Sequence, residues 1–569
     1  MGITMSIRVH RIGTNGFQNS SRRSVRRRRA LLGIAVGGLL LGLLSACSSS
    51  AGSAPGGSVG GGTSEHGLTE LPGGTPVRGG TFTAGVMTGG SAENLFPGTA
   101  AGNPDMARDA NLYDLLFNTN SEENLFPVSP GLALSAEPNA TATSWTLKLR
   151  DGVLWHDGKP FGADDVVYNF KVLWSDPNAN YSAGFLAGVV DFDNVRAVDN
   201  LTVEIPLLVP MAEFPSILGF MNFGVLQDGA TAESTAGHPI GTGPFKFESF
   251  TPGQQSVFVA NKDYWEEGKP YVDQLVINSS FTDNSALLNS LLSDSINLLI
   301  GPGLTQARAQ LAAKQVQVLE AASPTQIYAF GMRVDEGPFA DNRVREAFKL
   351  LVDRQAMING AFAGFGEVGN DLVGPYTQHF ANDLTVKQDL AKATELFKEA
   401  GVAGTTFDWP TAPVFPGMVE STTILAEQAK AAGVNINVQV GASGTYYTPA
   451  GGAYERYASV QVMQPSSSLT TNYRALLTRD APYPDTHWGW QKPGGEDAEA
   501  LIAKAIAAND PAAAEDLWHQ VQEQQFNEGG YVVWGRLPYI DMAGNNVRGL
   551  KTSGVLNFNQ FRFLDGWLV

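Results

Sequence analysis

Hydrophobic and polar positions alternate with a period of two from residue 144 to 150, and a helical spacing follows up to residue 174. The first stretch reads S-W-T-L-K-L-R, with a large apolar residue at every second position, which is typical of a half-buried strand. Asp-Gly turn pairs on either side of residues 153–156 indicate a short second strand there. Apolar residues then recur on one helical face behind Asp164 and Asp165. This pattern predicts a strand hairpin followed by a helix.

Comparable patterns continue along most of the chain. Asp341 stands where a helix cap is expected, before inward-facing apolar positions that extend to residue 352. Gly401 stands where a helix over 389–401 would end. Further predicted elements are a strand at 79–86, a hairpin at 195–206, and a helix followed by a strand between 424 and 440. The chain therefore mixes helices and strands.

The N-terminal 47 residues have the pattern of an export signal. A basic segment, Arg22–Arg29, precedes the apolar run 30–46, which is short for a stable membrane-spanning helix. The run ends in L-S-A-C, which is similar to a bacterial lipobox and includes Cys47, the only cysteine of the chain. We predict that 1–47 is a lipoprotein signal peptide with a lipidated Cys47, which anchors the protein to the outer face of the cell membrane. Export by the general or by the twin-arginine route stays open.

Length and charge narrow the class of protein. Residues 48–78 are rich in Gly, Ser, Thr and Pro, which predicts a flexible linker. A chain of 569 residues exceeds one ordinary core, so we expect two or three lobes. The formal net charge is −18, and removing the eight arginines of the first 46 residues leaves −26. This strongly negative net charge of the remaining chain argues against nucleic acid as a partner.

Three segments carry a resemblance to a known family. Residues 145–169 are similar to the signature of the family 5 extracellular solute-binding proteins, the dipeptide- and oligopeptide-binding receptors of ABC importers. The segments P-I-G-T-G-P-F at 239–245 and G-P-F-A-D-N-R-V-R-E-A-F at 337–348 are similar to two further stretches of that family. The resemblance covers about 79–440 closely and is looser from 441 to 569.

The resemblance implies an α/β fold like that of the type II periplasmic binding proteins, with two lobes, a central cleft and an inserted extra subdomain. Closure about a hinge would trap the solute between the lobes. Lobe I would comprise 79–118, 237–330 and 535–569, the inserted subdomain 119–236, and lobe II 331–534.

The implied function is the capture of a peptide or another small polar solute, an oligosaccharide included. The protein would act as a monomer without a cofactor and deliver the solute to an ABC permease driven by ATPase subunits. The alternatives are a sensor or chaperone lipoprotein on the same fold, and a secreted hydrolase. The sequence has no His or Cys pair at metal-ligand spacing, and no G-x-S-x-G, Walker or H-E-x-x-H motif. We therefore expect neither an enzyme nor a metal site.

The candidate ligand site departs from the pattern of the family. In its peptide-binding members an Asp pairs with the peptide's α-ammonium, and the matching position here falls near Pro465 or Ser466. No acid occurs from Ser459 to Tyr473, so we hypothesise that this receptor is not a general peptide binder. A replacement acid could come from Asp480 or Asp485, and the nearby Trp pair could either stack on a ligand or pack inside the lobe. The candidate ligand-binding residues are Asn94, Met463, Gln464, Ser466, Tyr473, Asp485, Trp488 and Trp490.

Overall fold

The computed structural model describes residues 66–100, 102–119, 128–447, 452–463, 468–478, 481, 486–488 and 498–569. Residues 63–569 form a compact unit by themselves. The predicted signal peptide with Cys47 and most of the predicted linker lie outside the described residues. Within the described part of the chain, no helix combines the length and the apolar composition that crossing a membrane requires.

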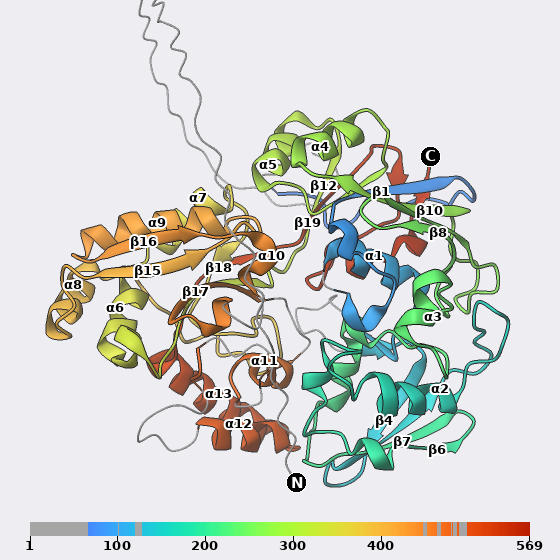
Figure 1. The fold of residues 1–569 in the computed structure, drawn as a ribbon, viewed down its shortest axis with the longest axis horizontal. Helices are drawn as coiled ribbons and strands as arrows, with labels where there is room; N and C mark the ends of the chain where they lie inside the picture. The colour runs from blue at the N-terminus through green and yellow to red at the C-terminus, as the bar shows by residue number, and fades with distance from the viewer. Residues whose placement is uncertain are drawn as a thin grey trace, which may run out of the picture. The chain divides into compact units, whose positions relative to one another are not determined.

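The first sheet, the core of lobe I, has seven strands in the spatial order β12-β19-β11-β1-β10-β9-β8 (Figure 1). Strands β1 and β10 run parallel, and the inward-facing side chains of β1, Phe82, Ala84 and Val86, are buried. The strands are β1 (Thr81–Met87), β8 (Phe245–Thr251), β9 (Gln255–Ala260), β10 (Gln274–Phe281), β11 (Leu298–Ile300), β12 (Gln317–Glu320) and β19 (Ile540–Ala543). Lobe I also contains the helices α4 (Asn284–Leu292) and α5 (Leu304–Ala313).

The second sheet, the core of lobe II, has the order β14-β18-β13-β17. Its central strand β13 is buried along its whole length, as expected for a strand covered on both faces. The strands are β13 (Gln326–Met332), β14 (Glu367–Val368), β17 (Ala458–Met463) and β18 (Tyr531–Leu537), next to the parallel pair β15 (Thr406–Thr411) and β16 (Asn435–Val440). The helices are α6 (Asn342–Leu351), α7 (Arg354–Ala361), α8 (Leu390–Glu399), α9 (Met418–Ala431), α11 (Leu469–Leu476), α12 (Ala498–Ala507) and α13 (Pro511–Glu528).

The inserted subdomain contains a four-stranded antiparallel sheet, β4-β5-β7-β6. The strand predicted from the alternation at 144–150 is confirmed as β5 (Ser144–Leu149), and the helix after it as α2 (Ala163–Tyr168). The segment 153–156 does not form the predicted second strand: both edges of β5 are paired, with β4 (Ala133–Pro138) and β7 (Thr202–Pro206), and Leu154 makes only an isolated bridge to Pro160. The predicted hairpin at 195–206 is confirmed, with β6 (Arg196–Asp199) paired to β7.

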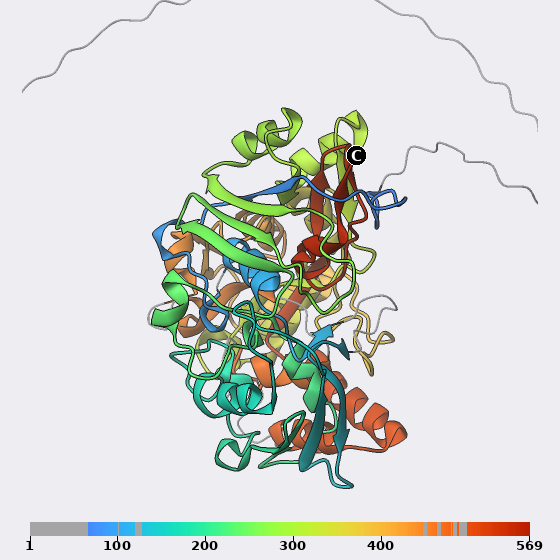
Figure 2. The same ribbon diagram turned by 90° about the vertical axis from the view of Figure 1, so that its right-hand side faces the viewer.

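Short elements complete the described fold. Helix α1 lies between the first sheet and the inserted subdomain in both views (Figure 1, Figure 2). These elements are α1 (Asn103–Leu112), α3 (Ala232–Gly237), α10 (Ser443–Tyr446), α14 (Asn557–Phe561), β2 (Phe117–Thr119), β3 (Val128–Pro130), β20 (Val547–Arg548) and β21 (Trp567–Leu568).

Asp114 joins lobe I segments that are far apart in the sequence. Its carboxylate accepts hydrogen bonds from the hydroxyls of Tyr264 (3.0 Å) and Thr242 (2.9 Å) and from the indole N–H of Trp265 (3.1 Å). Burial raises the pKa of Asp114, although these three donors oppose the shift. The family segment that contains Thr242 thus serves as scaffold.

His156 fastens the signature segment of the inserted subdomain to the same stretch of lobe I. Its backbone amide donates to the carbonyl of Gly241 (2.8 Å), and the amide of Gly241 donates to its Nδ1 (3.1 Å). Its Nε2 donates to the carbonyl of Gly243 (3.0 Å). Both ring nitrogens are therefore used by a neutral imidazole, and burial lowers the pKa of His156 to about 4.

We expect His156 to make the protein less stable in acid. Because its pKa falls from 6.5 in the unfolded chain to about 4 in the folded one, its contribution is complete above pH 6.5 and is lost as the pH falls towards 4. Relative to His156→Gln, the wild-type protein should lose about 2 kcal/mol of unfolding free energy between pH 7.5 and pH 5. Urea titrations of both proteins at the two pH values measure this difference. Parallel pH profiles would contradict the expectation.

Candidate functional site at the lobe boundary

Two crossings of the chain define the boundary between the lobes. The chain passes from β12 to β13 through residues 321–325, and it returns from β18 to β19 through 538–539. The expected lobe boundaries at 330 and 535 cut through β13 and β18, which both belong to the second sheet because they pair with each other. Strand ends next to these crossings therefore face the other lobe.

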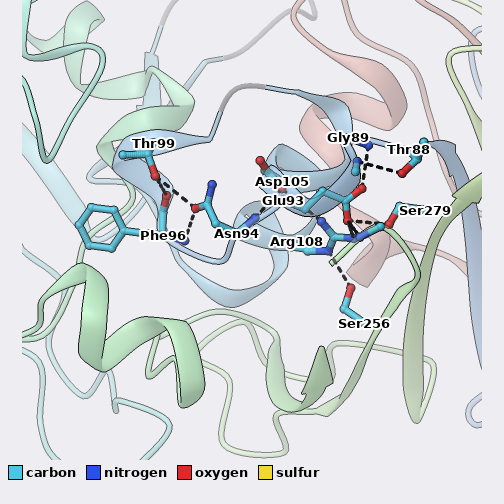
Figure 3. Close-up of polar contacts among 12 residues, drawn as sticks. Thr88, Gly89, Glu93, Asn94, Phe96, Thr99, Asp105, Arg108, Ser256 and Ser279 are labelled. Atoms are coloured by element: carbon cyan, nitrogen blue, oxygen red, sulfur yellow. Dashed lines mark hydrogen bonds and ion pairs between the residues drawn. The ribbon is translucent and has the colours of Figure 1, made fainter. Parts of the chain in front are cut away.

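Asn94 lies on the lobe I side of this boundary. Strand β1 runs parallel to β11, whose last residue pairs with Asp541 beside the second crossing. The loop that follows β1 therefore emerges at the boundary edge. Within it the Oδ1 of Asn94 accepts hydrogen bonds from the amide of Phe96 (2.9 Å) and the hydroxyl of Thr99 (3.2 Å). Figure 3 shows the amide nitrogen of Asn94 pointing away from these partners, which leaves a hydrogen-bond donor on the loop.

A buried ion pair holds this loop in place. Glu93 accepts from the guanidinium of Arg108 (2.8 Å), the hydroxyl of Ser279 (2.7 Å) and the amides of Gly89 (2.7 Å) and Gly253 (2.9 Å) (Figure 3). Burial opposes the ionisation of Glu93, but the donors from Gly253, Ser279 and Arg108 outweigh burial and lower its pKa. Since Glu93 precedes Asn94, this network fixes the position of the candidate ligand residue.

Met463 lies on the lobe II side. Strand β17 runs antiparallel to β13, so that Met463 pairs with Ile327 near the first crossing and Ala458 pairs with Met332 at the far end. Met463 is buried. The two candidates that follow it, Gln464 and Ser466, lie outside the described residues.

Tyr473 and Trp488 lie deeper in lobe II. Tyr473 is buried on α11, donates a hydrogen bond to Gln525 of α13 and packs against Trp518. Trp488 is also buried. The carbonyl two residues before it, at Thr486, accepts from the amide of Val334 (2.9 Å) just beyond β13, at the opposite end of that strand from Met463. Asp485 and Trp490 lie outside the described residues.

The structure thus places Asn94 and Met463 each near a crossing between the two sheets, and Tyr473 and Trp488 inside lobe II. The assignment of these residues to a ligand site remains a prediction. In the described part of the chain, no group of three or more His, Cys, Asp or Glu side chains could hold a metal ion.

Asp541 is a boundary residue that the sequence reasoning missed. It is fully buried on β19 and accepts from the side-chain amide of Asn557 (2.7 Å) and the backbone amide of Phe558 (2.7 Å). Burial raises its pKa to about 7. The signal in the sequence is a lone acid within the apolar run Y-I-D-M-A, which carries no information on where the strand lies.

Comparison with known proteins assigns the chain to a family. The model described as bacterial extracellular solute-binding proteins, family 5 Middle, matches residues 127–478, which is more than half of the chain. The chain belongs to this family. The family assignment confirms the resemblance of the three segments, and it makes the chain a binding protein of the kind that serves ABC importers, not an enzyme.

Individual relatives agree with this assignment. The glutathione-binding protein GsiB of Escherichia coli K12 is 25% identical over 487 residues, which cover 83% of this chain and 91% of the relative. The periplasmic binding protein DppA of Helicobacter pylori, solved with the peptide STSA, superposes with a TM-score of 0.74 and 21% identity over 86% of this chain and 98% of its own. The binding protein AgaA of A. tumefaciens R10, solved with agropinic acid, has a TM-score of 0.72 and 18% identity over 86% and 99% of the two chains. These neighbours confirm the type II periplasmic-binding-protein fold.

Proposed function

We propose that this protein captures a peptide or another small polar solute between lobe I and lobe II and delivers it, as a monomer, to the permease of an ABC importer. The proposal is supported by the Asn94 loop and the Met463 strand end, which each lie next to a crossing between the two sheets. Crossings of this kind are where a hinge can act. The solutes named for the relatives, glutathione, a tetrapeptide and agropinic acid, are all small and polar.

Closure on the solute tests this proposal. A solute held between two lobes is buried only when they approach each other, so saturation with the true ligand should reduce the radius of gyration. Small-angle X-ray scattering with and without glutathione, the peptide Ser-Thr-Ser-Ala and agropinic acid measures the change. An unchanged radius of gyration at saturation with a bound solute would contradict hinge closure.

Anchoring by a lipid forms the second part of the proposal. The L-S-A-C sequence follows an apolar run and places Cys47 as the acceptor, and two or more acyl chains give stable membrane binding. We expect Cys47→Ala to release the protein into the soluble fraction or to leave it unprocessed, as detected by fractionation and intact mass. A processed variant that still sediments with membranes and carries lipid would contradict the assignment.

The neutral stretch from Ser459 to Tyr473 predicts weak dependence on a peptide's amino group. With an acid pairing the α-ammonium, acetylation of that group would weaken binding by about 100-fold or more. Here we expect that acetylation of Ser-Thr-Ser-Ala changes Kd by less than about threefold, because no carboxylate occurs in this stretch to lose its partner. Titration calorimetry with both peptides measures the ratio. A loss of affinity of about 100-fold on acetylation would point to Asp480 or Asp485 as the replacement acid.

A further inference from the structure

The inserted subdomain touches lobe II at the start of helix α11. Its short 3-10 helix Phe214–Gly219 faces the first turn of α11. The hydroxyl of Ser216 lies 3.0 Å from that of Ser468 and 3.4 Å from that of Thr471, and those two lie 3.1 Å from each other. Because each hydroxyl both donates and accepts, hydrogen bonds among the three hydroxyls connect the two parts.

A carboxylate strengthens the same contact. Glu213 accepts a hydrogen bond from the hydroxyl of Thr470 (2.6 Å), and Thr470 is fully buried. The negative charge therefore lies beside the N-terminal turn of α11, where the helix dipole favours it. Two further bonds connect the same parts, from the guanidinium of Arg474 to the carbonyl of Ala187 (3.1 Å) and from the amide of Ala212 to the carbonyl of Ile506 (3.3 Å).

The position of the contact relates it to the candidate site. Ser468 caps α11 through its hydroxyl, which accepts from the amide of Thr471 (3.2 Å), and it lies only five residues beyond Met463 at the lobe boundary. The start of α11, which follows β17 along the chain, therefore contacts the inserted subdomain. A movement of lobe II away from lobe I would have to break these bonds or move the inserted subdomain with it.

We propose that the inserted subdomain is a latch that holds lobe II in the arrangement described here, and that Glu213 and Ser216 are positioning residues for solute capture. The positioning role of Glu213 and Ser216 rests on the proposed function, whereas the latch does not. When lobe II moves away from the inserted subdomain, each of these hydrogen bonds is replaced by hydrogen bonds to water. Each bond therefore shifts the equilibrium between the joined and the separated arrangement by only about two- to tenfold.

A disulfide tests the latch without any ligand. In the full chain with Cys47→Ser, which has no other cysteine, Ser216→Cys and Ser468→Cys put two thiols where hydroxyls lie 3.0 Å apart. We expect mild oxidation to remove both free thiols and to give a radius of gyration no larger than that of the reduced protein. The matched control pairs Ser468→Cys with Ser234→Cys on α3, which lies well apart from α11 in Figure 1. Free thiols in the folded Ser216/Ser468 variant under the same oxidant would overturn the latch.

A dissociation rate tests the positioning role. We expect Glu213→Gln with Ser216→Ala to release the peptide Ser-Thr-Ser-Ala about 10-fold faster, while Ser234→Ala releases it at the wild-type rate and the association rate stays nearly constant. A wild-type release rate in the double variant would overturn the positioning role. If the peptide fails to bind the wild-type protein, that result counts against the proposed peptide ligand, and the disulfide still decides the latch.

Discussion

Replacing Arg108 by methionine should destabilise the protein by about 3–5 kcal/mol, because it leaves a buried carboxylate without its partner. The guanidinium of Arg108 is fully buried and contacts Glu93 (2.8 Å), Asp105 (3.2 Å), Ser256 (2.8 Å) and Ser279 (2.8 Å). Methionine keeps much of the side-chain volume but donates no hydrogen bond. Glu93 would then stay buried with an uncompensated charge, and the loop that carries Asn94 would lose its fixed position. Urea unfolding measures the loss.

The control for Arg108 is an exposed ion pair. Arg343 and Asp341 lie 2.6 Å apart, with side chains that are 49% and 33% exposed, so Arg343→Met should cost less than about 1 kcal/mol. Glu93→Gln tests whether Glu93 and Arg108 stabilise the protein jointly. The double variant Glu93→Gln with Arg108→Met should lose less unfolding free energy than the sum of the losses of the two single variants. A loss of unfolding free energy below about 1 kcal/mol for Arg108→Met would contradict the role of Arg108 as the partner of a buried charge.

Gly241→Ala should also cause a large loss, of about 3 kcal/mol or more. A Cβ atom at this position would lie 1.8 Å from the carbonyl oxygen of Leu112 and 2.7 Å from its carbonyl carbon. Neither partner can move away easily, because the carbonyl of Leu112 also accepts from the amide of Gly243 (2.9 Å) and Gly241 is itself hydrogen-bonded to His156. Thermal and urea unfolding of the variant measure the effect.

A second glycine in the same region supplies the control for Gly241. Gly237, at the end of α3, is exposed, and among the described residues no heavy atom lies within 4 Å of a Cβ built there. Gly237→Ala should therefore change the unfolding free energy by less than about 0.5 kcal/mol. Equal stability of the two variants would contradict the close approach of the chain at Leu112.

Local patterns predicted the elements that have a regular period. The alternation of Trp145, Leu147 and Leu149 fixes one buried face, and the structure confirms the strand. The segment 153–156, predicted to be a strand, makes only an isolated bridge from Leu154 to Pro160, whereas β5 pairs with β4 and with β7. Periodicity states which residues face inward, but it does not state which strand lies next to which.

The candidate site was harder to predict for the same reason. Met463 and Trp488 are close in the sequence, yet the register of β17 on β13 places Met463 at the boundary, while the contact of Thr486 with Val334 holds the Trp488 region at the far end. The contact between Ser216 and Ser468 joins residues 252 positions apart. Small hydroxyl residues give no periodic signal, so only the folded chain shows that they meet.

Solute capture by a single chain is tested most directly by native mass spectrometry of the purified protein mixed with glutathione, the peptide Ser-Thr-Ser-Ala, agropinic acid and neutral oligosaccharides. We expect a complex of one solute per chain with one chemical class of the panel, formed by a monomer and lost on denaturation. Absence of a complex with every class, while the protein is folded, would contradict the claim that this family 5 protein captures a peptide or another small polar solute.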